Sequence, residues 1–218
     1  MAPRRKDMLS QYWYDKSLNI KKKDFGDWIK KREIRFYGEN NLYKSFTDKV
    51  INNTNEFIGN LMLDIKISES DEENPINRLF RDMPIADYFC KKKVQYINNP
   101  SSLRYFTSYS GGMLILTNKK TGEIHNPRDY DDGRSNFRYG VAIISLSGGV
   151  RNNARIIEAV IKHELTHMLG LEFHHHKNTN CLMTRKINSY DLCKNCHNAI
   201  NSFWNGIEER TGEKYLKV

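Results

Sequence analysis

The stretch from residue 139 to residue 170 constrains the fold of this chain more than any other. It begins with the apolar run "YGVAIISLSGG" (139–149), which predicts a strand buried on both faces of a sheet. The segment "NARIIEAVIKHELTHMLG" (153–170) follows, and its apolar residues recur at the spacing of an amphipathic helix. Gly170 is a suitable C-terminal stop for that helix. The sequence therefore predicts a helix that packs its apolar face on a sheet.

The polar residues of this helix form a metal-binding pattern. His163 and His167 are four residues apart, so their imidazoles project from the same face and can bind one zinc ion. Glu164 follows His163, and in the HExxH pattern this carboxylate accepts a proton from water that the metal activates. A catalytic zinc takes three protein ligands and keeps one position for water. A third ligand must therefore come from elsewhere in the chain.

Gly170 indicates where the third ligand comes from. In thermolysin-like enzymes this ligand is a glutamate on a later helix. Here the glycine lies three residues after His167, where it lets the chain turn sharply and return toward the metal. The histidine triplet 174–176 begins four residues further on. We read these histidines as ligands, and the alternative is a solvated polar loop.

Three of the four cysteines crowd into a short C-terminal stretch, at Cys181, Cys193 and Cys196. In an intracellular chain such spacing indicates a metal site more often than a disulfide. Three thiolates are one ligand short of a structural zinc site, and a histidine can supply the fourth. Cys90 stands alone, and we expect it to be a small buried apolar residue.

The segments "HELTHMLG" (163–170), "CLM" (181–183) and "CKNC" (193–196) together resemble the archaemetzincins, a family of the metzincin clan. The resemblance covers about residues 111 to 200. It implies a zinc metallopeptidase with two zinc ions, a catalytic one held by three histidines and a structural one held by four cysteines. It also implies a methionine turn, in which Met183 forms an apolar floor beneath the catalytic zinc.

The histidine triplet departs from the family pattern. The family's third histidine falls at Phe173 and its first structural cysteine at His174. Alignment from the cysteine side instead places His175 at the position of the third histidine and His176 at that of the structural cysteine. We prefer His174 over His175 for the catalytic zinc, because His174 needs only one extra residue in the turn. The expected ligands are thus His163, His167 and His174 (or His175) for the catalytic zinc, and His176, Cys181, Cys193 and Cys196 for the structural zinc.

The resemblance also implies the fold, an α+β metzincin-like architecture. A mixed twisted sheet packs against the active-site helix, and zinc pins a small C-terminal part, residues 171–218. Metzincins are similar in having an edge strand that pairs with an extended substrate. We assign that edge to residues 113–118 in "GGMLILTN", and we expect the polar segment 119–136 to be a long loop. Residues 1–30 form a basic, loosely docked start, and residues 31–218 form the metallopeptidase domain.

Composition adds expectations about location and partners. The net charge is +9, which indicates either a lysine-rich solvated surface or affinity for nucleic acid or another polyanion. No apolar run approaches the roughly 18 to 20 residues that a membrane helix needs. The start of the chain does not resemble a secretory signal. We therefore expect a cytoplasmic monomer with no membrane contact.

The preferred function is hydrolysis of peptide bonds in a peptide or protein substrate, with Glu164 as the general base. Two other classes remain open. The basic charge also fits a DNA-associated zinc protease, and HExxH can be purely structural in a non-enzymatic zinc-binding interaction module.

Overall fold

A computed structural model describes residues 12, 14–17, 27–39, 44–82, 100–119, 133–146, 153–174, 180–184, 187 and 189–217. The helices are α2 (Asp27–Lys31), α3 (Lys44–Asn60), α4 (Pro75–Asp82), the 3-10 helix η2 (Pro100–Phe106), α6 (Ala154–Met168) and α7 (Lys194–Thr211). The strands are β1 (Glu33–Tyr37), β2 (Lys66–Glu69), β3 (Gly112–Thr117), β4 (Gly133–Asn136) and β5 (Val141–Ser145).

The five strands form one mixed sheet in the order β2-β1-β3-β5-β4. The first four strands of that order run parallel, with Ile34 opposite Gly112 and Met113 opposite Val141. β4 runs antiparallel to β5 and lies at the edge of the sheet. β3 and β5 are buried along their whole length, as expected for central strands with both faces covered.

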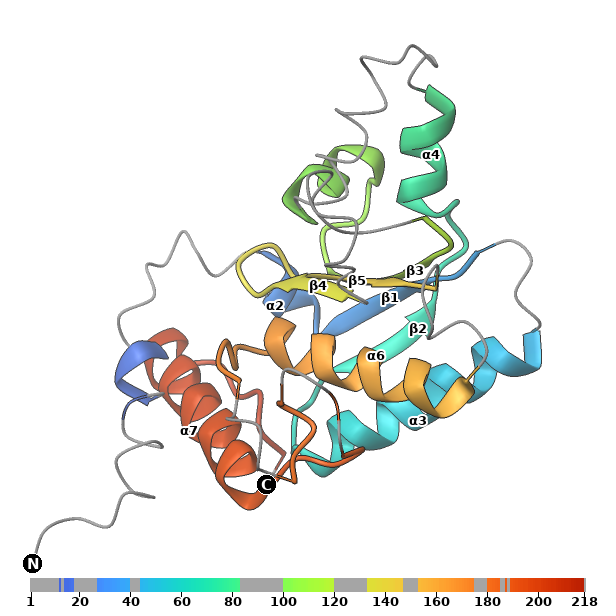
Figure 1. Ribbon diagram of the computed structural model, residues 1–218. Helices are drawn as coiled ribbons and strands as arrows, with labels where there is room; N and C mark the ends of the chain where they lie inside the picture. The colour runs from blue at the N-terminus through green and yellow to red at the C-terminus, as the bar shows by residue number, and fades with distance from the viewer. Residues whose placement is uncertain are drawn as a thin grey trace, which may run out of the picture.

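Alternating side chains of the central strands feed two separate cores. In β3, Leu114 and Leu116 belong to the larger core, which also contains the apolar residues of α3, α6 and α7. Met113 and Ile115 point to the smaller core under α4 and η2. Figure 1 shows the resulting three layers, with α4 above the sheet and α6, α3 and α7 below it. The period of two along a strand explains why one apolar run serves both layers.

Helix α6 forms as the sequence pattern predicts. Asn153 caps its first turn, since the side-chain oxygen accepts hydrogen bonds from the backbone N–H groups of Arg155 and Ile156. Its apolar face, with Ile161 and Leu165 fully buried, packs into the larger core. This packing fixes which way the polar face of α6 points, and therefore where its histidines lie.

The C-terminal part packs on the same core. Phe203 and Trp204 of α7 are buried, and the Trp204 indole N–H donates to the carbonyl of Leu169, just after α6. Near the start of the chain, Trp28 and Ile29 of α2 are also buried in this core. The core therefore includes residues that precede the expected domain start at residue 31.

Residues 14–17 lie against α7. The Tyr14 hydroxyl donates to Glu209, and Ser17 is buried so closely against Gly206 that no side chain fits there. Lys16 also pairs with Glu172, in the turn after α6. The expectation of a loosely docked start is therefore wrong for these residues.

Two assignments made from the sequence are wrong, one of an edge strand and one of a loop. β3, which contains residues 113–117, is an interior strand because β1 and β5 pair with its two sides. β4, at residues 133–136, is the edge strand on the β5 side of the sheet, and the sequence indicated a loop there. β4 has the polar sequence GRSN, so neither apolar content nor alternation distinguishes it from a loop. The α+β class, the mixed sheet and the position of the active-site helix are confirmed. None of the described helices is long and apolar enough to cross a membrane.

One buried side chain ties the smaller core together. Asn74 is 2% exposed, and its oxygen accepts the backbone N–H of Ile76 at the start of α4. Its amide nitrogen donates to the carbonyl of Leu116, near the end of β3, and to the carbonyl of Gly38, which directly follows β1. Asn74 thus joins a helix start to two strand ends, and each partner is lost if the amide is removed.

We predict that Asn74→Ala lowers the free energy of unfolding by about 2–4 kcal/mol, because it leaves buried backbone groups without partners. Urea denaturation measures this. Asn77→Ala is the matched control, since Asn77 makes one side-chain bond, to Glu39, and should cost about 1 kcal/mol or less. Equal losses for the two variants would contradict the role of Asn74.

Candidate active site and metal centres

Three histidines converge at the polar face of α6. His163 and His167 come from the helix, and His174 comes from the turn that follows it. Their Nε2 atoms lie 3.1 Å apart in all three pairs. His163 is almost fully buried, His167 is half-buried and His174 is exposed, so the group lies at the protein surface with one side toward solvent.

Two backbone carbonyls fix the orientation of the helical histidines. The Nδ1–H of His163 donates to the carbonyl of Leu182 at 2.8 Å, and the Nδ1–H of His167 donates to that of Leu171 at 2.6 Å. A carbonyl only accepts, so the proton of each neutral ring is on Nδ1. The Nε2 atoms of His163 and His167 then present lone pairs to each other with no hydrogen between them, an arrangement that a cation stabilises.

Burial keeps these rings neutral. Burial lowers the pKa of His163, and the nearby His174 adds to the effect. Burial likewise lowers the pKa of His167 to about 3, and the neighbouring His163 acts in the same direction. Neutral imidazole is the form that binds metals, so the environment already favours the state that a metal requires.

Gly170 and Phe173 explain how His174 reaches the group. Gly170 has a φ of 108°, a conformation that favours glycine, and a Cβ there would collide with Phe203 of α7. Phe173 packs against the larger core. Because the apolar Phe173 turns inward, the next residue is the one that meets His163 and His167. His175 and His176 lie outside the described residues.

The spacing of the histidine nitrogens fits zinc. Two nitrogens bound to one tetrahedral zinc at about 2.0–2.1 Å lie about 3.3 Å apart, and three ligands with one open position are typical of catalytic zinc. The observed separation of 3.1 Å is close to that value. The residues present therefore fit a zinc ion bound by three imidazoles.

Glu164 follows His163 on the same helix and is 8% exposed. The Ser135 hydroxyl of β4 donates to its Oε2 at 2.8 Å. Gly133, also in β4, leaves the space that the Glu164 side chain fills, since a Cβ there would lie 2.4 Å from Glu164 Cγ. The carboxylate is thus held between α6 and the edge strand.

A second cluster brings Cys181, Cys193 and Cys196 together. Their sulfur atoms lie within 4.8 Å of one another, and Cys181 Sγ is 3.7 Å from Cys196 Sγ. A disulfide requires about 2.05 Å, whereas two sulfurs on a tetrahedral zinc at about 2.3 Å lie about 3.8 Å apart. This spacing fits metal-bound thiolates and excludes a disulfide in this conformation.

Hydrogen bonds prepare Cys181 for the thiolate form. The Cys196 thiol, and then the backbone N–H groups of Cys193 and Met183, lower the pKa of Cys181 to about 5 against the opposing effect of burial. The Cys193 N–H lies 3.2 Å from Cys181 Sγ. Hydrogen bonding to Cys181 and burial raise the pKa of Cys196. A metal ion would hold three adjacent thiolates together, because its charge favours the deprotonated form of each ligand.

The two clusters share a short piece of backbone. Cys181 belongs to the thiol group, and the next residue, Leu182, supplies the carbonyl that orients His163. Met183 follows and is fully buried in the larger core. A role for Met183 as a floor beneath the histidine group stays a prediction.

Sequence reasoning missed four groups of this site. They are the carbonyls of Leu171 and Leu182, Ser135 and Gly133. Backbone carbonyls leave no sequence signal, because any residue supplies one. For Ser135 and Gly133, a signal exists only once residues 133–136 are recognised as a strand, since alternation then places both residues on one face.

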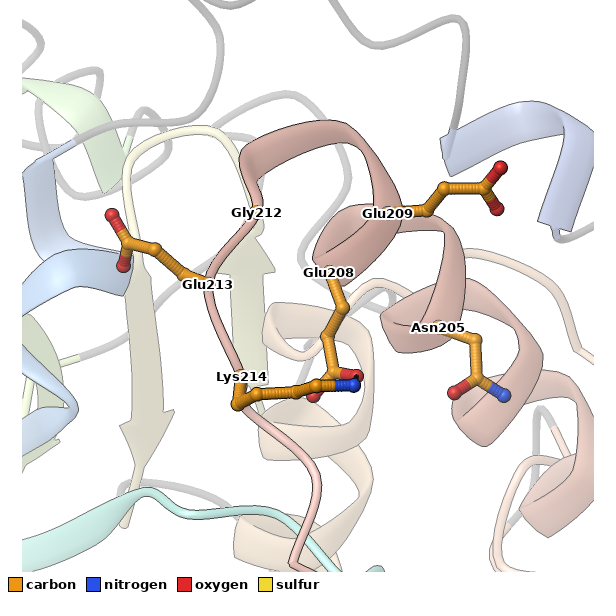
Figure 2. A pocket seen from close by; sticks show the side chains of 6 residues that line it. All are labelled: Asn205, Glu208, Glu209, Gly212, Glu213 and Lys214. Carbon is orange, nitrogen blue, oxygen red and sulfur yellow. Dashed lines mark ion pairs between the residues drawn. The ribbon is translucent and has the colours of Figure 1, made fainter.

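A separate hollow of about 470 Å³ lies at the C-terminal end of α7 (Figure 2). It is lined by Asn205, Glu208, Glu209, Gly212, Glu213 and Lys214. Glu208 accepts hydrogen bonds from the backbone N–H groups of Tyr215 and Leu216 and pairs with Lys214. Its carboxylate thus holds the C-terminal turn, and no lining residue belongs to the histidine or thiol group.

Comparison with solved structures supports the fold. The chain is similar to archaemetzincin from Methanopyrus kandleri, with 16% identity, 79% of this chain and 95% of that chain covered, and a TM-score of 0.50. It is less similar to archaemetzincin from Archaeoglobus fulgidus in complex with malonate (16% identity, 75% and 97% covered, TM-score 0.46). A zinc-dependent peptidase from Methanocorpusculum labreanum gives 17% identity, 77% and 100% covered, and a TM-score of 0.45. No family model and no curated protein matches the sequence.

The Methanopyrus kandleri structure shows that this chain has the archaemetzincin fold, as the sequence resemblance implied. At 16% identity the similarity establishes the fold and not the chemistry. The chemistry rests on this chain's own side chains. Within the described residues, these are one group of three imidazoles beside a buried carboxylate and one group of three thiols.

We predict that the protein binds two zinc ions per chain and that Cys193→Ser binds one, because the two clusters use different side chains. Elemental analysis measures the ratio. Cobalt substitution separates the sites, since only cysteine ligands give intense thiolate-to-cobalt absorption.

His174→Ala is the matched variant for the other cluster. It should also bind one ion, yet it should keep the thiolate absorption that Cys193→Ser loses. A single ion in the unaltered chain, or the same absorption in both variants, would contradict the division into two metal centres.

Proposed function

We propose that this protein is a zinc-dependent metallopeptidase that hydrolyses peptide bonds. The observation that carries the proposal is the arrangement of His163, His167 and His174, whose Nε2 atoms converge at 3.1 Å, with the buried Glu164 on the same helix. Three neutral nitrogens, one open position and a carboxylate are the parts that zinc-assisted hydrolysis requires.

Each side chain has a distinct task. His163, His167 and His174 hold the zinc, which when bound acts as a Lewis acid that activates water and polarises the scissile carbonyl. Glu164 accepts a proton from the attacking water and delivers it to the leaving amine. The carbonyls of Leu182 and Leu171 keep the proton of each helical histidine on Nδ1 and away from the metal.

The substrate class follows from the edge strand. Among the described residues, β4 pairs only with β5, and its Ser135 contacts Glu164. An extended peptide adds to such an edge through main-chain hydrogen bonds, which recognise peptide backbone rather than one side chain. The peptide-binding edge that we first assigned to residues 113–118 thus belongs to β4 in this proposal.

A second zinc at Cys181, Cys193 and Cys196 is part of the proposal. Its task is to pin the segment that leads into α7. His176 remains our candidate for the fourth ligand, because a structural zinc takes four ligands.

The remaining expectations stay predictions. The net charge of +9 keeps open a contact with nucleic acid, including the DNA-associated protease class. DNA-stimulated cleavage that is lost at high salt would support that class, since phosphate contacts weaken as salt rises. Cytoplasmic location and a monomeric state are likewise predictions.

We predict that Glu164→Gln lowers kcat by about 10²–10⁴-fold without loss of zinc, because glutamine keeps the shape of the side chain but does not accept the proton. Turnover is measured on a mixed library of peptides by mass spectrometry, and zinc by elemental analysis.

Glu158→Gln is the matched control, because Glu158 is on the same helix but pairs with Lys162 and Asn53 instead. It should keep activity within about twofold, as expected for a partly exposed side chain away from the reacting atoms. Activity that survives Glu164→Gln would contradict the mechanism. A zinc-loaded chain that cleaves no peptide would favour the zinc-binding interaction module instead.

A further inference from the structure

The edge strand β4 faces the active-site helix with two side chains. Residues 133 and 135 are two apart, so they lie on one face of the strand, and both meet Glu164. Arg134 and Asn136 lie on the opposite face by the same alternation. A four-residue strand of polar sequence is therefore built against one carboxylate of α6.

Ser135 supplies a directed hydrogen bond. Its Oγ donates to Glu164 Oε2 at 2.8 Å, and the carboxylate is 8% exposed. A buried carboxylate needs polar partners, and a bond to one chosen oxygen fixes the rotation of the group about its last side-chain torsion. Ser135 thus holds Oε2 against its own hydroxyl, while Oε1 lies beside Gly133.

Gly133 provides the space for the same carboxylate. A Cβ at this position would lie 2.4 Å from Glu164 Cγ, 2.8 Å from Cδ and 2.9 Å from Oε1. Any side chain at residue 133 must therefore push Glu164 away from its position. Ser135 draws the carboxylate toward β4, and Gly133 lets it approach.

We propose that Ser135 is a positioning residue for Glu164, and that Gly133 is the residue that makes this position accessible. The inference rests on the proposed peptidase function and deepens it. Ser135 does not touch the reacting atoms; it acts by holding the general base in one orientation toward the water that attacks the substrate.

The placement also joins substrate binding to base orientation. An added peptide strand would pair with the main-chain groups on the outer side of β4. The face of β4 that carries Gly133 and the Ser135 side chain meets Glu164 instead. A peptide that pairs with the edge orders the same four residues that hold the base. Correct pairing of the substrate backbone thus favours the orientation of Glu164 that the reaction needs.

The test compares Ser135→Ala with Ser135→Thr, using the peptide that the unaltered enzyme cleaves fastest. Ser135→Ala should lower kcat by about 10- to 100-fold with KM within about twofold, because misorientation of a catalytic group affects the reaction rather than binding. Ser135→Thr keeps the hydroxyl and suits a strand, so it should restore kcat to within about threefold. Zinc content and thermal midpoint are measured for both variants.

A double-mutant cycle with Glu164→Gln separates positioning from general structural damage. If Ser135 acts through Glu164, Ser135→Ala should cost less than about twofold in the Glu164→Gln background. Gly133→Ala should lower kcat at least as much as Ser135→Ala while zinc stays bound.

Several outcomes would overturn the role of Ser135 alone. They are a kcat for Ser135→Ala within twofold of the unaltered enzyme, failure of Ser135→Thr to restore it, or losses that multiply fully in the double variant. Peptide hydrolysis that is absent in the unaltered chain, or unaffected by Glu164→Gln, would overturn the proposed function and the role of Ser135 with it.

Discussion

The facing lone pairs of two imidazoles, those of His163 and His167, are the constraint on which the rest of the site depends. They face each other because two backbone carbonyls accept the Nδ1–H groups of His163 and His167. Without these carbonyls either ring could carry its proton on Nε2, and the cluster would hydrogen-bond internally instead of offering nitrogen lone pairs to a cation. The orientation of two rings, rather than the presence of histidine alone, thus makes this group suited to a metal ion.

The surrounding structure supplies these carbonyls from two directions. The Leu171 carbonyl lies directly after the turn at Gly170, where Phe203 of α7 prevents any side chain. The Leu182 carbonyl is held between Cys181 and the buried Met183. α7 contacts both segments, through Phe203 at Gly170 and through Cys196 at Cys181, although it contributes no ligand to the histidine group. Side chains of the larger core thus determine the geometry of the candidate site.

The apolar elements and the side-chain ligands were predictable from the sequence. The contacts that depend on backbone geometry were not. The strands at residues 112–117 and 141–145 and the helix with His163, Glu164 and His167 were predictable, because apolar period and motif spacing are strong signals. The preference for His174 followed from the length of the turn, and the structure places that residue beside the other two. β4 was missed because an edge strand need not be apolar, and with it the contacts of Ser135 and Gly133 were missed.

The bond from His163 to Leu182 spans 19 residues of sequence, and the sulfur atoms that surround Cys181 come from residues 193 and 196. During synthesis the histidine helix is therefore complete well before the groups that orient its first imidazole exist. A nascent or truncated chain that ends near residue 180 contains the whole HExxH motif and still lacks an aligned cluster. The alignment of the histidine group therefore waits until the segment that leads into α7 has docked.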